Sequence, residues 1–158
     1  MARLVAGAAN AQPFTDPLEV HALGHVGQTT HVDEYTVAIC KFPGEILATL
    51  ATSVQLDQDN VVRIFGTEAR VLLRKPWLPA PNGGFSEILL ERAGREPETL
   101  PVAAAVGPYE YEIDAVAAQL TAREAREMTL ADSIGNAQTL DRWRRAIGLS
   151  YAADLTPG

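Results

Sequence analysis

The chain has 158 residues, of which 47% are hydrophobic and 21% are charged, a composition typical of one soluble globular domain. Its formal net charge is −7, so it has no excess of cations for neutralising a phosphate backbone, which argues against a nucleic-acid partner. No run approaches the roughly 20 apolar residues that a membrane-spanning helix needs, which argues against a membrane partner.

The single cysteine, Cys40, lies within an apolar run and cannot form an internal disulfide. A buried thiol of this kind suits a reducing compartment. Residues 1–11 also lack the charged, apolar and cleavage regions of a secretory signal peptide. Together these features predict a cytoplasmic location.

The first residues are predicted to form the last turns of a helix, because apolar side chains recur at helical spacing over residues 2–8 with no capping residue ahead of them. Prolines between 12 and 17 end this helix, and residues 18–26 are predicted to form a strand. A hairpin follows, in which Pro43-Gly44-Glu45 makes the turn between strands 32–42 and 46–56.

The pattern of short strands continues beyond a polar turn at residues 57–60. Further strands are predicted at 61–65, 69–75, 85–92 and 98–102. Between the second and third of these lies a loop, residues 76–84, with three prolines and two glycines around Trp77. Loops of this length more often serve a function than merely connect elements.

From Gly107 onward the apolar period changes from that of a strand to that of a helix. Pro108 suits a first helical turn, and Thr129 to Asp132 has the pattern of a capping box before a second helix. The apolar residues of this last helix share one face, which we expect to pack on the sheet: Leu130, Ile134, Ala137, Leu140 and Ile147. The cations Arg142, Arg144 and Arg145 fall in its final turns, where the helix dipole favours them, and this explanation is preferred to an anion site.

The central strands are apolar on both faces. In residues 32–42, Ala38, Cys40 and Phe42 alternate with Val37 and Ile39, and residues 46–56 behave alike. We therefore predict an α+β domain with an open, largely antiparallel sheet of six or seven strands and two C-terminal helices on one face. The other face requires a partner, and a second copy of the chain is predicted to cover it.

Motifs for catalysis or cofactor binding are missing from the sequence. No Gly-x-Gly-x-x-Gly turn follows a strand, and Gly24-His-Val-Gly27 lacks the spacing needed to hold a pyrophosphate. His21 and His25 would lie about 13 Å apart along a strand, too far to share one metal ion. No serine lies in a nucleophile elbow. We predict no catalytic, cofactor-binding or metal-ligating residue in the chain.

Several motifs, in order, resemble a known family. They are Met-Ala-Arg-Leu-Val-Ala-Gly at 1–7, His31-Val-Asp-Glu-Tyr35, Lys41-Phe-Pro-Gly44, Ile64-Phe-Gly-Thr-Glu68, and the ending from Met128 to Leu149. Their order resembles the C-terminal domain of the glucose-fructose oxidoreductase, inositol dehydrogenase and rhizopine-catabolism family (Gfo/Idh/MocA), and the ending is similar to its dihydrodiol and xylose dehydrogenase branch.

The resemblance implies that residues 1–158 are a single C-terminal domain, on the substrate and assembly side, of an enzyme that oxidises or reduces a sugar, polyol or cyclic diol with NAD or NADP. In that family an N-terminal Rossmann domain holds the cofactor, and the catalytic residues precede the stretch that matches residues 1–7. The chain alone is then expected to be inactive. Arg74-Lys75-Pro76 superficially resembles the family's Glu-Lys-Pro motif, but Arg replaces Glu and Lys75 is interpreted as a solvated charge at a strand end.

Four residues are candidates for contact with a polyol substrate, since they are polar or aromatic and lie at strand or helix starts or in the long loop: His31, Asp33, Trp77 and Tyr109. The alternative for each is an ordinary loop anchor or surface group. A rival hypothesis for the whole chain is a free-standing, non-catalytic dimerisation or ligand-binding module.

Overall fold

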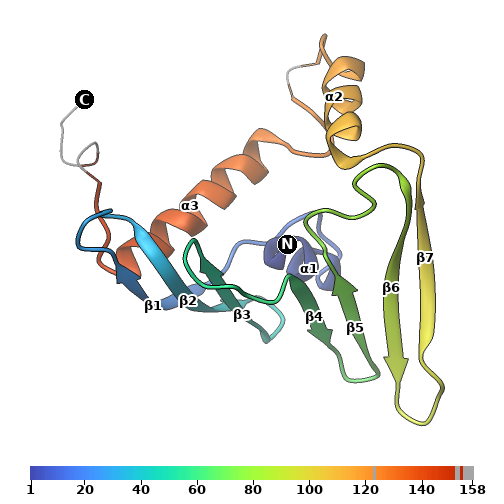
Figure 1. Ribbon diagram of the computed structural model, residues 1–158, viewed down its shortest axis with the longest axis horizontal. Helices are drawn as coiled ribbons and strands as arrows, with labels where there is room; N and C mark the ends of the chain where they lie inside the picture. Colours follow the sequence, from blue (N-terminus) through green and yellow to red (C-terminus); the bar gives the residue numbers. More distant parts are fainter. Residues whose placement is uncertain (123, 152–153, 155–158) are drawn as a thin grey trace. The chain divides into compact units, whose positions relative to one another are not determined.

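The computed structural model describes residues 1–122, 124–151 and 154 (Figure 1). Its elements, in order, are α1 (Ala2–Ala9), β1 (Glu19–Val26), β2 (Asp33–Phe42), β3 (Ile46–Ser53), β4 (Val61–Phe65), β5 (Ala69–Arg74), β6 (Gly84–Arg92), β7 (Glu98–Ala104), α2 (Pro108–Ala118) and α3 (Leu130–Ala146). The chain divides into two compact units. The first unit joins Met1–Gln58 to the C-terminal stretch that begins at Met128, and the second unit is Asp59–Glu127.

The strands form two antiparallel sheets, β1-β2-β3 in the first unit and β4-β5-β6-β7 in the second. The α+β class is confirmed, but the prediction of a single six- or seven-stranded sheet is not. β3 ends at Ser53, three residues earlier than predicted, because the Ser53 hydroxyl accepts hydrogen bonds from the amides of Gln55 and Leu56 at 2.9 and 2.7 Å. This local turn takes the chain out of the first sheet.

The strand β2 alternates strictly between buried and exposed side chains. Cys40 and Phe42 are buried and pack against Ala6 of α1, so the core of the first unit lies between this helix and one face of its sheet. Burial raises the pKa of the Cys40 thiol, because the thiolate would lose its solvation there. The expectation of a buried thiol is confirmed.

The helix α3 attaches to the same face of the first sheet through polar side chains. The Trp143 indole donates a hydrogen bond to the hydroxyl of the buried Thr36 at 2.8 Å. The Arg142 guanidinium donates to the carbonyl oxygens of Pro17 and Leu18, at 2.5 and 2.7 Å. These bonds join the C-terminal helix to the start of β1 and to the middle of β2.

The predicted packing of the α3 apolar stripe is wrong for all of its residues except Ile147, which is half-buried and lies next to Gly24 of β1. Leu130, Ile134 and Leu140 are all exposed, whereas Asp132 and Gly135 are buried. Hydrogen bonding decides the orientation, since the opposite side of the helix carries Arg142 and Trp143, whose donors find partners on the sheet and on the segment before it. The predicted cap is confirmed, because the Thr129 hydroxyl accepts the Asp132 amide at 3.2 Å.

Arg3 of α1 forms an ion pair with Asp16 and a hydrogen bond with α3. Arg3 Nε donates to Asp16 Oδ1 at 2.7 Å, and Arg3 Nη1 donates to the Asp132 carbonyl at 3.0 Å. Gly135 makes room for this contact, because a Cβ atom there would overlap the Arg3 guanidinium and lie 2.5 Å from Asp16 Oδ1. The N-terminal segment is thereby held against the last helix.

The second unit is built differently. Among its described residues no apolar side chain is buried, and no residue of α2 is buried. The two helices that cover a sheet face are therefore α1 and α3, both on the first sheet, and the prediction that the two C-terminal helices share this role is wrong for α2. No helix within the described residues is both long and apolar enough to cross a membrane.

The attachment of α3 yields a stability prediction. Arg142→Met removes both hydrogen bonds to the Pro17 and Leu18 carbonyls while keeping a long apolar side chain. We expect the free energy of unfolding to fall by about 2–4 kcal/mol, because a bond to a charged donor contributes about 1.5–3 kcal/mol and the bond to the Leu18 carbonyl, which is exposed to solvent, contributes less. The measurement is urea unfolding followed by circular dichroism.

The matched control is Arg145→Met on the same helix. Among the described residues the Arg145 Nε atom bonds only to the Asp141 carbonyl of its own helix, at 3.1 Å, so the change should cost less than about 0.5 kcal/mol. Equal losses in the two variants would contradict the account of how α3 is held.

Candidate functional site

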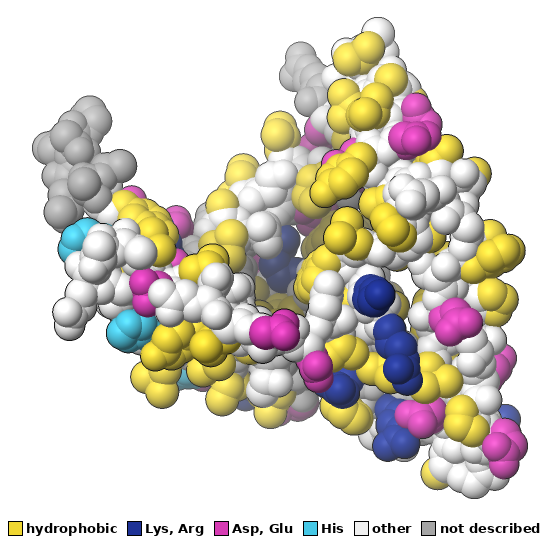
Figure 2. Space-filling model, in the orientation of Figure 1, with side chains coloured by type: hydrophobic (Ala, Val, Ile, Leu, Met, Phe, Trp, Pro, Cys, Tyr) yellow, Lys and Arg dark blue, Asp and Glu magenta, His cyan; other side chains and the backbone are white. Residues whose placement is uncertain are grey.

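One face of the first sheet is left uncovered by helices. We call it the uncovered face, and its residues are His21, Leu23 and His25 of β1, Tyr35, Val37 and Ile39 of β2, and Leu47, Thr49 and Ala51 of β3. Val37 and Ile39, on the central strand, are 53% and 54% exposed. Figure 2 shows hydrophobic side chains gathered on this side of β1, β2 and β3, away from α3. Central-strand side chains with this exposure indicate a surface suited to a partner.

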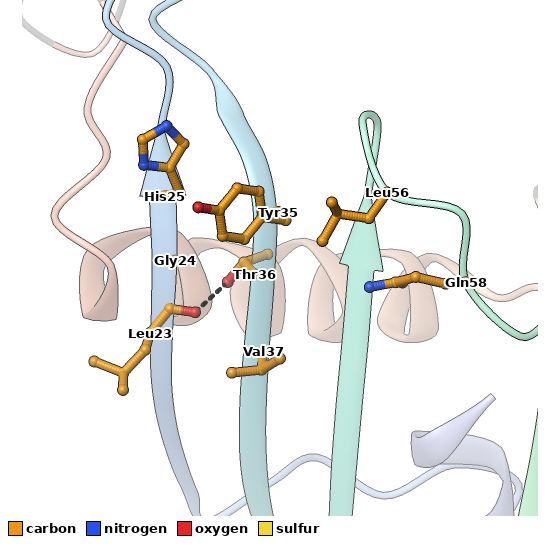
Figure 3. A pocket seen from close by; sticks show the side chains of 8 residues that line it. All are labelled: Leu23, Gly24, His25, Tyr35, Thr36, Val37, Leu56 and Gln58. Atoms are coloured by element: carbon orange, nitrogen blue, oxygen red, sulfur yellow. Dashed lines mark hydrogen bonds between the residues drawn. The ribbon is translucent and has the colours of Figure 1, made fainter.

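A shallow hollow of about 500 Å³ lies at one end of the uncovered face (Figure 3). It is lined by Leu23, Gly24, His25, Tyr35, Thr36, Val37, Leu56 and Gln58. The side chains come from β1, from β2 and from the segment that follows β3, with α3 behind the sheet. Its floor is largely apolar and the polar groups of His25 and Gln58 lie at its sides.

Two aromatic rings form one wall of this hollow. His25 and Tyr35 are cross-strand partners, and their rings stack with centroids 5.0 Å apart and an interplanar angle of 16°. A flat, half-exposed pair of rings offers a large contact area at low entropic cost, as is usual for residues at the centre of an interface.

A buried carboxylate supports the His25 ring from behind. Glu34 is only 8% exposed; its Oε1 atom accepts a hydrogen bond from the Thr30 hydroxyl at 2.9 Å, and its Oε2 atom lies 3.5 Å from His25 Nε2. Gly27 leaves the space for this carboxylate, because a Cβ atom at position 27 would overlap Glu34 and Thr30. Glu34 therefore joins the turn after β1 to the ring pair.

The Glu34 carboxylate also affects whether the neighbouring glycines could bind the phosphates of a cofactor. The residues Gly24 to Gly27 lead from β1 into a turn and then β2, and not into the N-terminus of a helix. The space beside Gly27 is filled by the Glu34 side chain, which would repel a pyrophosphate. These residues do not fit the phosphates of a dinucleotide.

The four residues predicted from the sequence lie in two different units. His31 is exposed in the β1–β2 turn, with a positive φ of 56°, and Asp33 begins β2. Trp77, 58% exposed, lies in the long loop of the second unit, and Tyr109, 67% exposed, lies in the first turn of α2. Among the described residues no hydrogen bond, ion pair or ring contact joins any two of the four, so their role in substrate binding stays a prediction.

Sequence reasoning missed His25, Glu34 and Tyr35 as a group. Two of them lie within the segment His31 to Tyr35 that carries the family resemblance, but the segment alone does not reveal which side chain turns inward. Strict alternation along β2 would have placed Glu34 on the buried side. The pairing of Tyr35 with His25 depends on the register of β1, which the sequence does not specify.

Comparison with known proteins finds sequences and structures that are similar to this chain. A curated protein of Rhizobium meliloti named "Uncharacterized oxidoreductase ORF334" is 29% identical over 135 residues, which are 83% of this chain and 40% of that protein. No protein-family model matches the sequence.

Solved structures share the fold. A 3-ketoreductase from Actinomadura kijaniata, KijD10, in complex with TDP-benzene and NADP, matches 93% of this chain and 46% of its own with a TM-score of 0.74 and 19% identity. UDP-N-acetylglucosamine 3-dehydrogenase GnnA from Acidithiobacillus ferrooxidans matches 96% and 46%, with a TM-score of 0.66 and 17% identity. The chain therefore has the fold of part of these oxidoreductases and spans less than half the length of each of these three proteins.

The close approach of the Glu34 carboxylate to Gly27 yields a prediction about stability. Gly27→Ala would displace the Glu34 carboxylate and break its contacts with Thr30 and His25, so we expect a loss of about 1–3 kcal/mol in unfolding free energy. Gln28→Ala, at the exposed neighbouring position, should change stability by less than about 0.5 kcal/mol. Thermal and urea unfolding of both variants provide the measurement, and a Gly27→Ala protein as stable as wild type would contradict the proposed role of Glu34.

Proposed function

We propose that this chain is the C-terminal, substrate-side and assembly domain of an NAD(P)-dependent oxidoreductase of the Gfo/Idh/MocA family, in its dihydrodiol and xylose dehydrogenase branch. Its substrate would be a sugar, a polyol or a cyclic diol. The observation that carries the proposal is the fold, since nearly the whole chain superposes on somewhat less than half of oxidoreductases such as KijD10 and GnnA. The five ordered motifs and the curated oxidoreductase relative support the same conclusion.

The proposal assigns hydride transfer to the enzyme as a whole. KijD10 is bound to NADP in its crystal structure, whereas in this chain the Glu34 carboxylate fills the space beside Gly27, so the residues from Gly24 to Gly27 do not fit the phosphates of a dinucleotide. We infer that a Rossmann domain of the same enzyme holds the NAD or NADP and supplies the catalytic residues. His31, Asp33, Trp77 and Tyr109 remain our candidates for substrate contact.

Two exposed apolar surfaces support an assembly role. The uncovered face of the first sheet carries exposed apolar side chains on all three strands, and we propose that a second copy of the chain covers it about a twofold axis. An interface of about 800 Å² on each partner would suffice for stable association. On the opposite side of the first unit, the exposed stripe of Leu130, Ile134 and Leu140 on α3 suits contact with the cofactor-binding domain.

The coding sequence upstream of Met1 tests the proposed function. We expect an in-frame segment with a Gly-rich turn between a strand and a helix, followed by Glu-Lys-Pro. A stop codon in that frame would contradict the proposal and support a free-standing dimerisation or ligand-binding module.

The isolated chain should bind neither NAD nor NADP, because no Gly-rich turn at a helix N-terminus is present among its described residues. Calorimetric titration with each cofactor should give no binding of micromolar affinity, and no sugar should be turned over. Micromolar affinity for either cofactor would contradict the proposal that a separate Rossmann domain holds the NAD or NADP.

The proposed subunit contact predicts opposite results for two adjacent substitutions. Ala51→Asp places a charge on the uncovered face, opposite Val37, and should convert the chain to a monomer in light scattering. Thr52→Asp is the control, because Thr52 pairs with the buried Thr36 and lies on the other side of the sheet. It should leave the dimer mass unchanged. A wild-type chain that is monomeric at tens of micromolar, or an Ala51→Asp protein with unchanged mass, would contradict the interface.

A further inference from the structure

A second hollow, in the second unit, collects basic side chains. We call it the basic basin, a shallow depression of about 320 Å³ lined by Asp59, Asn60, Val61, Arg63, Leu72, Arg74 and Lys75. Figure 2 shows Lys and Arg side chains gathered over the region of β4 and β5. Three of the 13 cations of an acidic chain therefore line one small depression.

The register of β4 and β5 places two of these cations on the same face. Arg63 pairs with Leu72 and Val61 pairs with Arg74, so Arg63 and Arg74 are diagonal neighbours, whose Cα atoms in such a pair lie about 7–8 Å apart. Like charges at this separation repel each other. The arrangement is favourable when an anion lies between them.

Nearby arginines are neutralised by the protein, whereas those of the basin are largely not. Arg70 forms two hydrogen bonds with Glu91, and Arg92 pairs with Glu98 at 3.0 Å. In the basin Asp59 lies 3.8 Å from Arg63, but its side chain is 85% exposed. Within the described residues no carboxylate pairs with Arg74 or Lys75. Two positive charges are thus available to a ligand.

The backbone at Lys75 supplies an independent observation. Lys75 has a φ of 53°, in the left-handed region that non-glycine residues rarely adopt, and it precedes Pro76. The strained conformation is held because the Lys75 amide donates to the Asn60 carbonyl at 3.0 Å and the Leu78 amide donates to the Lys75 carbonyl at 3.3 Å. Strain of this kind is concentrated at binding sites, where it fixes the direction of a side chain.

We propose that the basic basin binds a small phosphate-bearing anion with two charged groups, such as a diphosphate. Arg63 and Arg74 would each contact one end, Lys75 would add a point charge, and the Asn60 amide would add a neutral donor. A small anion fits better than a nucleic acid, because the basin is small and the chain as a whole carries a net charge of −7. The proposal does not depend on the oxidoreductase function.

Inorganic pyrophosphate is the probe for the test. It is titrated into the ¹⁵N-labelled chain at low ionic strength, where screening is weak, and the Asn60 and Lys75 amides and the arginine Nε–H signals are followed by NMR. Saturable shifts confined to the basin are expected. Arg74→Glu should weaken binding by at least about tenfold, the factor expected on losing a charge-assisted hydrogen bond. Asp59→Asn should strengthen it, since Asp59 is the carboxylate that lines the basin.

Arg95→Glu is the matched control, because it makes the same change of charge on an exposed turn of the second unit outside the basin. Its affinity should stay within about twofold of wild type, as expected for a charge beyond close contact. Three results would overturn the proposal: shifts that do not saturate, an equal loss of affinity in Arg95→Glu and Arg74→Glu, or tighter binding of a hexaglutamate peptide than of pyrophosphate. The last result would assign the basin to an acidic protein segment.

Discussion

The hydrogen bonds of Arg142 and Trp143 determine much of the first unit, because they fix which side of the sheet the C-terminal helix covers. Both side chains reach across more than 100 residues of sequence, to the segment before β1 and to Thr36 on β2. The Arg3 and Asp132 contact then places α1 on the same side. With both helices on one face, Ala38, Cys40 and Phe42 are buried in the core, and Tyr35, Val37 and Ile39 are left exposed on the other face.

The second unit lacks a buried apolar core among its described residues. Its sheet and its helix α2 contain apolar side chains, yet none of these is buried among the described residues. Burial of apolar area is the main favourable term in folding, so a unit without a buried core is expected to gain stability from other surfaces. This is consistent with the proposed role as one part of a larger enzyme, in which other segments would cover such surfaces.

The sequence was sufficient for the local elements and insufficient for their packing. Turn residues such as Gly44, with its positive φ of 77°, and the cap at Thr129 are local signals, and the strands and helices that they bound were predicted within a few residues. The orientation of α3 could not be predicted from its apolar stripe, because long-range hydrogen bonds of Arg142 and Trp143 outweigh it. The two-sheet division depends on the Ser53 hydroxyl, a contact too specific for a periodicity argument.

The side-chain contacts of the candidate site, like the packing of the helices, could not be predicted from the sequence. His31 and Asp33 were chosen because polar residues at strand starts could contact a polyol, and the structure places His31 in the turn before β2 and Asp33 at the start of β2. The stacked pair of His25 and Tyr35 and the buried Glu34 depend on strand register and on the space beside Gly27. A single sequence fixes neither of these, so tertiary contacts had to be known first.

The central claim is that the first sheet buries one face within the chain and the other face against a second copy. Methyl NMR with a soluble paramagnetic agent tests it directly. The methyl groups of Ala38 and Leu50 should be protected at every protein concentration, while those of Val37, Ile39 and Leu47 should be protected only when the chain is concentrated and become accessible on dilution. Val37 and Ile39 methyl groups that remain accessible at high concentration would contradict the account.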